Sequence, residues 1–377
     1  MTDTENGGAP AGRVTMKDIA ARLGVSINTV HKAISGKPGV SDAVRERILA
    51  MASELGYRRN EGASNLSRKD VRAVVCLPSP QREGSYFYAY LWEGCERYVR
   101  ESRDSGLAFE RMEFGLGEYA RSLEGVLGRL EAGEAIGGLL AYAPSSAEER
   151  GLLARIADAG CKVVLVDGDC AQTGRVGASI SDYRAAGELM AEQALNLLAC
   201  EKDPCVLLLS GEASTDSHRL VAQAFREGVA TGLPSARIVE LPGAHARTLE
   251  LEIALETALG CEGAQLACSV SAVGTEVLAE TLAARGDARV RAIGNDLFPG
   301  SAGALRSGVL TNLVYKDPVG MAYRAAAMLG DCLLWGKVPE KPVLMGSVQL
   351  VFRSNLAQYC AAAGVEERPA AARVACR

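Results

Sequence analysis

The sequence predicts a small all-α head followed by an α/β body of two lobes, each lobe built on a parallel sheet. Three observations support this prediction. The chain has 377 residues, more than one typical domain. Its first part shows short helical patterns separated by glycine-containing turns. From residue 71 onward, continuous apolar runs alternate with amphipathic helical segments, which is typical of doubly wound parallel sheets.

Changes in residue pattern along the chain suggest the domain boundaries. We expect, in order, a disordered N-terminus at 1–12, a helical head at 13–59, a hinge at 60–70, a body at 71–365 and a disordered tail at 366–377. Nearly three hundred residues of α/β pattern favour two lobes over one. We assign about 71–193 and 319–342 to the first lobe, and about 194–317 and 343–365 to the second.

Charge is distributed unevenly between the head and the rest of the chain. From Arg13 to Lys69 the lysines and arginines outnumber the acidic residues eleven to five, so this stretch carries +6. The whole chain carries −5, which leaves −11 for the remainder. A basic head on an acidic body is expected when only the head meets phosphate.

Several protein classes are disfavoured by the composition. The first twelve residues do not resemble a signal peptide, and no apolar run approaches the length of a membrane span, so we expect a cytoplasmic protein. Eleven cysteines are scattered from Cys76 to Cys376 without a CxxC pair. We interpret them as reduced structural thiols, and expect neither a metal site nor a cofactor.

The head shows the pattern of a helix-turn-helix. Thr15 and Asp18 form a capping box that begins a first helix, Gly24 ends it, and Ser26 caps a second helix that runs to about Ser35. On that second helix the apolar residues at i, i+3 and i+4 predict a buried face made of Val30, Ala33 and Ile34. A third amphipathic helix follows. Two short helices around such a turn, with a third packed behind, form a helix-turn-helix.

The residues of this head resemble the LacI (lactose repressor) family headpiece. The resemblance is nearly continuous from Val14 to Ser41 and extends through Arg45–Ile48 and Glu54–Tyr57. It implies a sequence-specific DNA-binding transcription regulator, a repressor, whose second helix enters the major groove of double-stranded DNA.

The predicted outer face of the second helix supplies the candidate base contacts. Asn28 suits adenine, with which asparagine forms two hydrogen bonds. His31 and Lys32 stand where the family usually has Ser-Arg, so the operator is expected to differ from common family operators. Ile27 either touches a thymine methyl group or only seats the helix, and His31 is either a DNA contact or a solvated helix residue. The candidate phosphate contacts are Thr15, Ser26 and Thr29.

The hinge resembles the family segment that folds on the operator. Asn60, Ala63 and Leu66 match that segment, and the resemblance implies that Leu66 wedges into the minor groove. Arg59 replaces the usual proline. The alternative interpretation is a plain linker. The segment is too polar to fold alone, which suits both a linker and folding on the operator.

The body resembles the type I periplasmic-binding-protein fold that the family uses as its sensor. Ligands of such sheets bind beyond the carboxyl ends of the strands. The matching positions give the candidate ligand-binding residues Phe87, Tyr88, Asp169, Arg175, Asp182, Arg219, Asp296 and Lys316. Three alternatives stay open: Asp182 only caps the following helix, Arg219 is a surface residue, and Lys316 pairs with Asp296 rather than favouring an acidic ligand.

The resemblance also implies how such a regulator works. A homodimer places two heads on a pseudo-palindromic operator, and a small ligand between the lobes alters operator affinity. A sugar is the first candidate ligand; a nucleoside, or a ligand-free body that only dimerises, are the alternatives. No nucleophile–histidine constellation or phosphate-binding loop is present in the sequence, so we predict that the protein is not an enzyme.

Overall fold

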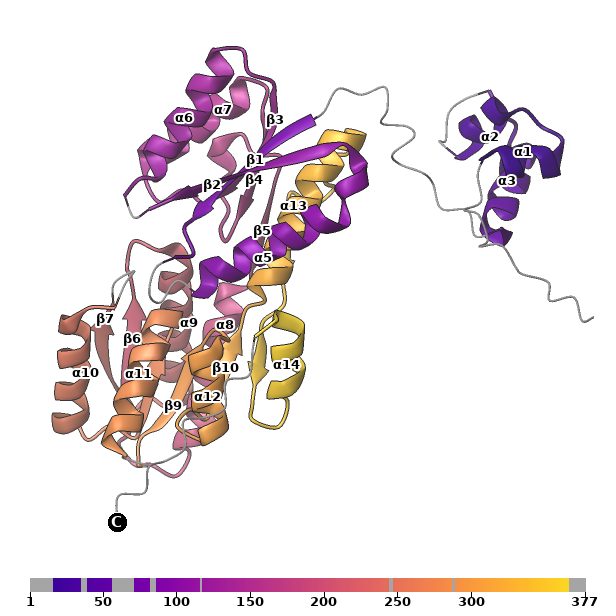
Figure 1. Cartoon of the computed structure of the whole chain (residues 1–377). Helices are drawn as coiled ribbons and strands as arrows, with labels where there is room; N and C mark the ends of the chain where they lie inside the picture. The colour runs from indigo at the N-terminus through magenta and orange to yellow at the C-terminus, as the bar shows by residue number, and fades with distance from the viewer. Residues whose placement is uncertain are drawn as a thin grey trace, which may run out of the picture. The chain divides into compact units, whose positions relative to one another are not determined.

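The chain divides into two compact units, residues 1–68 and 69–377 (Figure 1). The computed structural model describes residues 16–34, 39–55, 71–81, 86–115, 117–243, 247–286 and 289–365. We call the described part of the first unit the head and that of the second unit the body.

The head is a bundle of three helices. These are α1 (Met16–Leu23), α2 (Ile27–Ile34) and α3 (Asp42–Glu54). One fully buried residue from each helix, Ile19, Val30 and Ile48, meets in the centre of the bundle. Gly24 adopts φ +66° between α1 and α2, a left-handed conformation that glycine reaches at no steric cost. This small core fixes which face of α2 is left for solvent.

The first lobe of the body is a parallel sheet with the strand order β11-β5-β4-β3-β1-β2. Its strands are β1 (Val71–Pro78), β2 (Leu107–Phe114), β3 (Ile136–Tyr142), β4 (Lys162–Val166), β5 (Gly177–Ser181) and β11 (Val343–Gly346). Helices α5 (Tyr86–Glu101) and α13 (Pro318–Trp335) cover one face, and α6 (Tyr119–Glu131) and α7 (Ala147–Asp158) cover the other. Two short 3₁₀ turns lie at Arg103–Ser105 and Ala171–Thr173.

The second lobe repeats this arrangement with the strand order β12-β10-β9-β8-β6-β7. Its strands are β6 (Cys205–Gly211), β7 (Arg237–Pro242), β8 (Leu266–Ser269), β9 (Arg291–Asn295), β10 (Asn312–Tyr315) and β12 (Gln349–Val351). Only β12, among the described strands of this sheet, runs antiparallel to its neighbour. Helices α8 (Tyr183–Leu198) and α9 (Asp216–Gly232) cover one face; α10 (Leu249–Cys261), α11 (Ala272–Arg285), α12 (Pro299–Ser307) and α14 (Leu356–Ala363) cover the other.

The lobe boundaries differ from the sequence-based prediction in two places. Helix α8 was assigned mainly to the first lobe, yet its Met190 and Ala186 pack with Phe225 in the core of the second. Strand β11 was assigned to the second lobe, yet it pairs with β5 of the first. Both elements adjoin points where the chain crosses between lobes, and an amphipathic pattern does not specify which sheet its apolar face will cover.

The described cysteines and helices bear on three further expectations. Ten cysteines in the described residues are free thiols, of which Cys200 and Cys261 are exposed and Cys170 is half-buried. Within the same residues, no cluster of His, Cys, Asp or Glu side chains could hold a metal ion. None of the described helices is both long and apolar enough to cross a bilayer.

Gly94 sets the approach of α5 to α13 in the first lobe, and we expect Gly94→Ala to destabilise the body. A Cβ at this position would lie 2.2 Å from the carbonyl oxygen of Val319 and 2.9 Å from Cβ of Ala322. Relieving that overlap requires the two helices to separate, which should lower the free energy of unfolding by about 1–3 kcal/mol. The measurement is the urea midpoint. Gly125→Ala on α6 is the matched control, because its Cβ meets nothing within 4 Å, and equal effects of the two substitutions would contradict this account.

Candidate functional site

The outer face of α2 is the candidate surface in the head. Val30 and Ala33 are buried in the head core, which leaves Asn28 on the opposite side of α2. Ile27 lies one turn before Val30, at the edge between the buried and the outer face. Ile27 is 45% exposed and Asn28 is exposed. Lys32, farther along the helix, is half-buried. The structure thus agrees with the predicted division of α2 at Val30, Ala33 and Asn28, whereas Ile34, predicted as buried, and Lys32, predicted on the outer face, are both half-buried.

Both ends of α2 are held by hydrogen bonds. At its start, Ser26 Oγ accepts a hydrogen bond from the Thr29 backbone N–H at 3.0 Å, and it lies 2.8 Å from Thr29 Oγ1. This confirms Ser26 as the N-cap. At its end, Arg45 Nη1 of α3 donates to the carbonyl oxygens of Ala33 (2.9 Å) and Lys32 (3.3 Å). The bonds from Arg45 therefore hold the end of α2 against α3.

Some of the predicted DNA contacts cannot be placed. Thr15, Asn60, Ala63 and Leu66 lie outside the described residues, and so does the side chain of His31. Their roles stay predictions.

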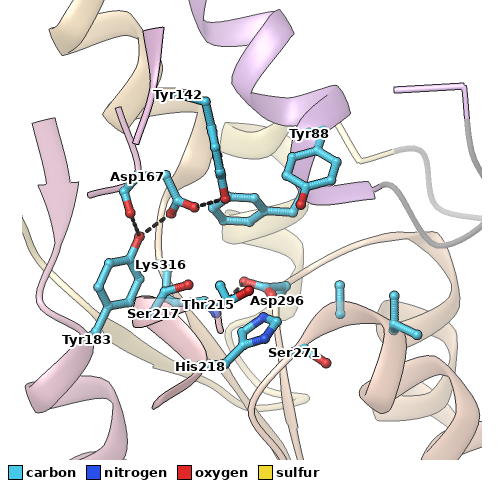
Figure 2. Close-up of a pocket in the computed structure, with 13 residues that line it drawn as sticks. Tyr88, Tyr142, Asp167, Tyr183, Thr215, Ser217, His218, Ser271, Asp296 and Lys316 are labelled. Carbon is cyan, nitrogen blue, oxygen red and sulfur yellow. Dashed lines mark hydrogen bonds and ion pairs between the residues drawn. The ribbon is translucent and has the colours of Figure 1, made fainter. Parts of the chain in front are cut away.

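In the body, two aspartates occupy the same position in the two lobes. Asp167 directly follows β4, and Asp296 directly follows β9. Both adopt a left-handed backbone, with φ of +69° and +66°, a conformation in which aspartate is more frequent than most residues. Because the carboxyl ends of both sheets face the cleft between the lobes, both carboxylates line one small pocket, which we call the inner compartment (Figure 2).

Asp167 is held by two tyrosine hydroxyls. Tyr142 of β3 donates to its Oδ2, and Tyr183 of α8 donates to its Oδ1. Tyr183 belongs to the second lobe, so the second bond ties the lobes together. Burial raises the pKa of Asp167 to about 6, and the two hydroxyls and Lys316 oppose that rise.

Asp296 is paired with Lys316, which follows β10. Lys316 Nζ lies 3.2 Å from Asp296 Oδ1, and both side chains are at least 93% buried. The ammonium group also lies 5.8 Å from the centroid of the Phe87 ring. Burial raises the pKa of Asp296, and the lysine partly offsets that effect. Lys316 is therefore paired with Asp296, which is one of the two alternatives that the sequence left open for this lysine.

Hydroxyl groups and aromatic rings complete the inner compartment. Phe87 and Tyr88, two of the candidate ligand residues, lie on the first turn of α5 and line it. The second lobe adds the side chains Thr215, Ser217, His218 and Ser271 (Figure 2). The cavity volume is about 60 Å³. Hydrogen-bonding groups thus face a small space that has an aromatic side.

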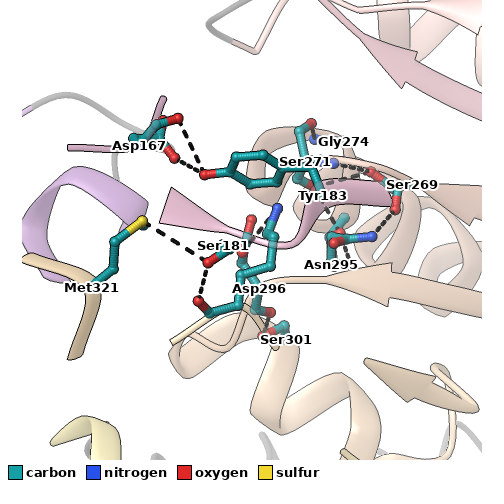
Figure 3. Close-up of polar contacts among 12 residues, drawn as sticks. Asp167, Ser181, Tyr183, Ser269, Ser271, Gly274, Asn295, Asp296, Ser301 and Met321 are labelled. Carbon is teal, nitrogen blue, oxygen red and sulfur yellow. Dashed lines mark hydrogen bonds and ion pairs between the residues drawn. The ribbon is translucent and has the colours of Figure 1, made fainter. Parts of the chain in front are cut away.

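A buried polar network supports the aspartate of the second lobe (Figure 3). Ser301 Oγ donates to the backbone oxygen of Asp296 at 3.0 Å, and Asn295 Nδ2 donates to that of Ser269 at 2.7 Å. Ser181 Oγ donates to the Lys316 carbonyl oxygen at 2.6 Å, which joins two of the chain crossings between the lobes. These bonds hold the left-handed turn at the end of β9 in place.

Four predicted ligand residues lie outside the inner compartment. Asp169 and Arg175 form an ion pair with each other, with Arg175 Nη2 donating to Asp169 Oδ2 at 2.8 Å. Asp182 accepts from the Ala185 N–H at 2.9 Å and caps α8, the alternative weighed from the sequence. Arg219 is about half exposed and pairs with Asp216. Of the eight predicted residues, the structure brings together Phe87, Tyr88, Asp296 and Lys316.

Asp167 and its two tyrosines were not among the residues predicted from the sequence. Asp169 was chosen from the run Asp167-Gly168-Asp169 because it matched the family pattern. The available signal was position, because Asp167 is the first residue after a buried strand, as Asp296 is in the second lobe. Tyr142 and Tyr183 stood in apolar strand and helix patterns that gave no reason to choose them.

Two protein-family models match the chain. The one for bacterial regulatory proteins of the lacI family matches residues 15–60, and the one for the periplasmic binding protein domain matches residues 79–337, more than half of the chain. The chain belongs to the LacI family. Its body is a periplasmic binding protein domain.

Curated relatives of this LacI-family chain match it over short stretches. It is 32% identical over 89 residues to the ribose operon repressor of Haemophilus influenzae, and 45% identical over 58 residues to the maltose regulon regulatory protein MalI of Escherichia coli. These matches cover 24% and 15% of this chain, and 26% and 17% of the relatives. The chain thus aligns with about a quarter or less of their length.

Solved structures resemble the body of this LacI-family chain. A solute-binding protein of an ABC transporter from Burkholderia graminis, in complex with D-arabinose, has a TM-score of 0.68 at 18% identity. GanP, a glucose-galactose binding protein from Geobacillus stearothermophilus, has a TM-score of 0.66 at 17% identity. Each likeness covers 77% of this chain and nearly all of the other one, 98% and 99% respectively. At this identity they establish the fold.

Proposed function

We propose that this LacI-family protein is a transcription repressor that binds a pseudo-palindromic DNA operator, with an affinity set by a small polar ligand in the cleft. The observation that carries the proposal is α2, with a packed inner face, capped ends and an outer face that bears Ile27 and Asn28. A helix held in this way fits the major groove. The lacI family match over residues 15–60 supports it.

Asn28 is proposed to read a base, and the residues around the helix start to contact phosphates. An exposed asparagine near the amino end of a recognition helix suits two hydrogen bonds to adenine. Ser26 and Thr29 lie at that same end, where backbone N–H groups also favour an anion. Lys32 adds a positive charge. Thr15 and His31 are proposed as further DNA contacts on the resemblance alone.

We expect Asn28→Ala to weaken operator binding about 5- to 150-fold. The loss of a bidentate base contact is worth about 1–3 kcal/mol of discrimination. The measurement is a titration of the operator against the full chain at fixed salt, next to a titration of unrelated DNA. Binding to unrelated DNA should change little, and Ser53→Ala on the exposed side of α3 serves as the control. A uniform loss on both DNAs would place Asn28 at a phosphate instead.

A sugar is proposed as the ligand in the cleft. Carboxylates and hydroxyls beside aromatic rings are the groups that bind polyols, and the inner compartment has all three. The names of the ribose operon and maltose regulon relatives favour the same class. A nucleoside-type ligand, or a body that only dimerises, remain the alternatives.

Contacts across the cleft are proposed to couple ligand binding to DNA binding. Tyr86 of α5 stacks on Phe298 of the second lobe at 4.4 Å between ring centroids, and its hydroxyl donates to Glu276 at 2.9 Å. A ligand held by both lobes favours one arrangement of the lobes, and with it one set of these contacts, over another. Such a change is a population shift. We propose that the conformation of the hinge residues Asn60, Ala63 and Leu66 depends on the arrangement of the lobes.

A homodimer formed through the bodies is proposed to carry the two heads. Half-sites one helical turn of DNA apart, about 34 Å, need two recognition helices in one assembly. Leu249 and Ile253 lie one turn apart on α10 and are 66% and 56% exposed, an apolar stripe that a second copy would cover. Sedimentation of the full chain, compared with that of the Leu249→Glu variant, tests this.

The first experiment on the whole proposal is an electrophoretic mobility shift. The full chain is titrated onto the DNA upstream of its own gene and onto a random-sequence DNA library, with and without a panel of sugars. A specific shift that one sugar abolishes supports both halves of the proposal. Failure to select any sequence from the library would overturn the DNA-binding half.

A further inference from the structure

The cleft does not end at the inner compartment. Beside it lies a second cavity of about 330 Å³, which we call the outer compartment. The two cavities share the lining residues Tyr88, Tyr142, Asp167, Thr215 and Ser217. Because these shared side chains stand between the two spaces, one ligand placed in the outer compartment would reach Asp167 at its inner end.

Size separates the two compartments. A water molecule needs roughly 10–15 Å³, so the inner cavity of about 60 Å³ holds only about four to six waters. That is less than a sugar ring with its hydroxyls requires. The outer cavity of about 330 Å³ falls within the roughly 300–1,000 Å³ of sites that hold small molecules. The body of a ligand therefore fits the outer compartment, and a single substituent fits the inner one.

The outer compartment has an apolar wall on the side of the first lobe. Phe114, at the end of β2, stacks on Tyr119 of α6 with ring centroids 4.3 Å apart and an interplanar angle of 18°. The Tyr119 hydroxyl donates to the Tyr142 carbonyl oxygen, which fixes the stack relative to β3. Pro78 and Pro144 extend this wall. Aromatic and proline surfaces of this kind suit the flat face of a ring.

Polar groups surround the rest of the outer compartment. Ser79, Ser145 and Asp169 line it from the first lobe, and Ser214 lines it from the second. The charged residues Glu149, Arg150 and Asp216 line it too. Asp169 is already paired with Arg175, so it presents a carboxylate of fixed orientation. Hydroxyls and an oriented carboxylate match the hydroxyls of a sugar rather than a purely apolar molecule.

Charge in the inner compartment argues against an acidic substituent. Its lining contains the carboxylates Asp167 and Asp296 and the ammonium of Lys316. The ammonium is already 3.2 Å from Asp296. A phosphate or carboxylate placed there would add negative charge to a buried site whose one lysine is paired, which is costly in a low-dielectric environment.

From these observations we propose that the ligand of this cleft is an uncharged two-ring glycoside, a disaccharide or an aryl glycoside. One ring stacks on the wall formed by Phe114 and Tyr119 in the outer compartment, and one hydroxyl-bearing end enters the inner compartment beside Asp167. This inference rests on the proposed function, because it takes the cleft as the effector site. It assigns the ligand contacts mainly to a cavity that the sequence analysis did not predict.

The test compares one-ring and two-ring probes on the full chain by isothermal titration calorimetry. The probes are glucose and galactose against cellobiose, maltose, lactose and phenyl β-glucoside, with glucose 6-phosphate as the acidic probe. We expect at least one two-ring probe to bind ten or more times more tightly than its one-ring counterpart. Glucose 6-phosphate should not bind detectably.

A substitution in the outer compartment provides an independent readout. Ser145→Trp fills that cavity from its exposed edge and should weaken the two-ring probe ten-fold or more. Ser307→Trp, at the exposed end of α12, is the matched control and should leave its affinity unchanged. Thermal unfolding of both variants checks that they are folded, and the comparison of probes on the unmodified protein stands without either variant.

The outcomes distinguish this inference from the function it rests on. Equal affinity for one-ring and two-ring probes, tighter binding of glucose 6-phosphate, or no binding of any two-ring probe would overturn the two-ring assignment. None of these results tests the selection of a DNA sequence by the head. Failure of DNA selection, with cellobiose or another two-ring probe still binding, would overturn the regulator and leave the ligand assignment standing.

Discussion

Replacement of Lys316 by methionine is expected to lower the free energy of unfolding of the body by about 3–5 kcal/mol. The substitution removes the one ammonium that lines the inner compartment and leaves the carboxylates of Asp167 and Asp296 buried together. Breaking a buried ion pair by removing one partner is strongly destabilising, because the remaining charge has lost both water and its counter-ion. Urea unfolding followed by fluorescence measures the effect, since both tryptophans, Trp92 and Trp335, lie in the body.

Two comparisons make the Lys316 prediction specific. Lys316 lowers the pKa of both aspartates, so without it they should hold their protons to higher pH. The destabilisation should therefore be smaller at pH 5 than at pH 8. Adding Asp296→Asn to Lys316→Met should recover much of the lost stability, because the double variant removes one of the two unpaired charges. A double variant whose loss equals the sum of the two single losses would show that the pair is not coupled.

Asp167→Asn is expected to change the pH dependence of stability by about 3 kcal/mol. The folded protein holds the Asp167 proton to a pKa of about 6, above the ordinary aspartate value of 3.8. Between these values the folded chain binds more protons than the unfolded chain, so the free energy of unfolding falls as pH rises from about 4 to about 6 and stays lower above it. A shift of this size corresponds to about 3 kcal/mol.

The asparagine variant isolates this effect because its amide does not titrate. Other carboxylates titrate in the same pH range, but they do so in both proteins and cancel in the difference. The stability of Asp167→Asn relative to the unmodified protein should therefore rise by about 2–3 kcal/mol from pH 4 to pH 7, as measured by urea unfolding at each pH. Asp182→Asn is the control, since this half-buried carboxylate caps a helix. A difference that is constant across this range would rule out a raised Asp167 pKa.

The head was predictable because its determinants are local. The positions of Val30 and Ala33 on one face of α2, and the cap at Ser26, involve residues one turn apart. Helical periodicity expresses such contacts directly in the sequence. The long-range contacts of the head, such as the hydrogen bond from Arg45 to the end of α2, leave no comparable pattern in the sequence.

The body was predictable at its centre and less so at its edges. Runs such as Val163–Val166 are buried on both faces, and continuous apolar runs of this kind became the strands β1, β3, β4, β6, β8 and β9. The edge strands β2 and β7 carry charged residues such as Arg111 and Glu240, so they gave no continuous apolar run. The lobe that holds α8 and β11 was decided by packing and strand pairing.

By itself the sequence determined the helix-turn-helix head, the parallel α/β body and the family, because periodicity and short motifs depend on near neighbours. Only the tertiary structure decided which carboxylates meet in the inner compartment. It placed Asp167 there and Asp169 in the outer compartment, made Asp182 a helix cap and paired Lys316 with Asp296. Asp167 and Asp296 are 129 positions apart in the numbering. They converge because two sheets direct their carboxyl ends into one cleft, a relation that no local pattern encodes.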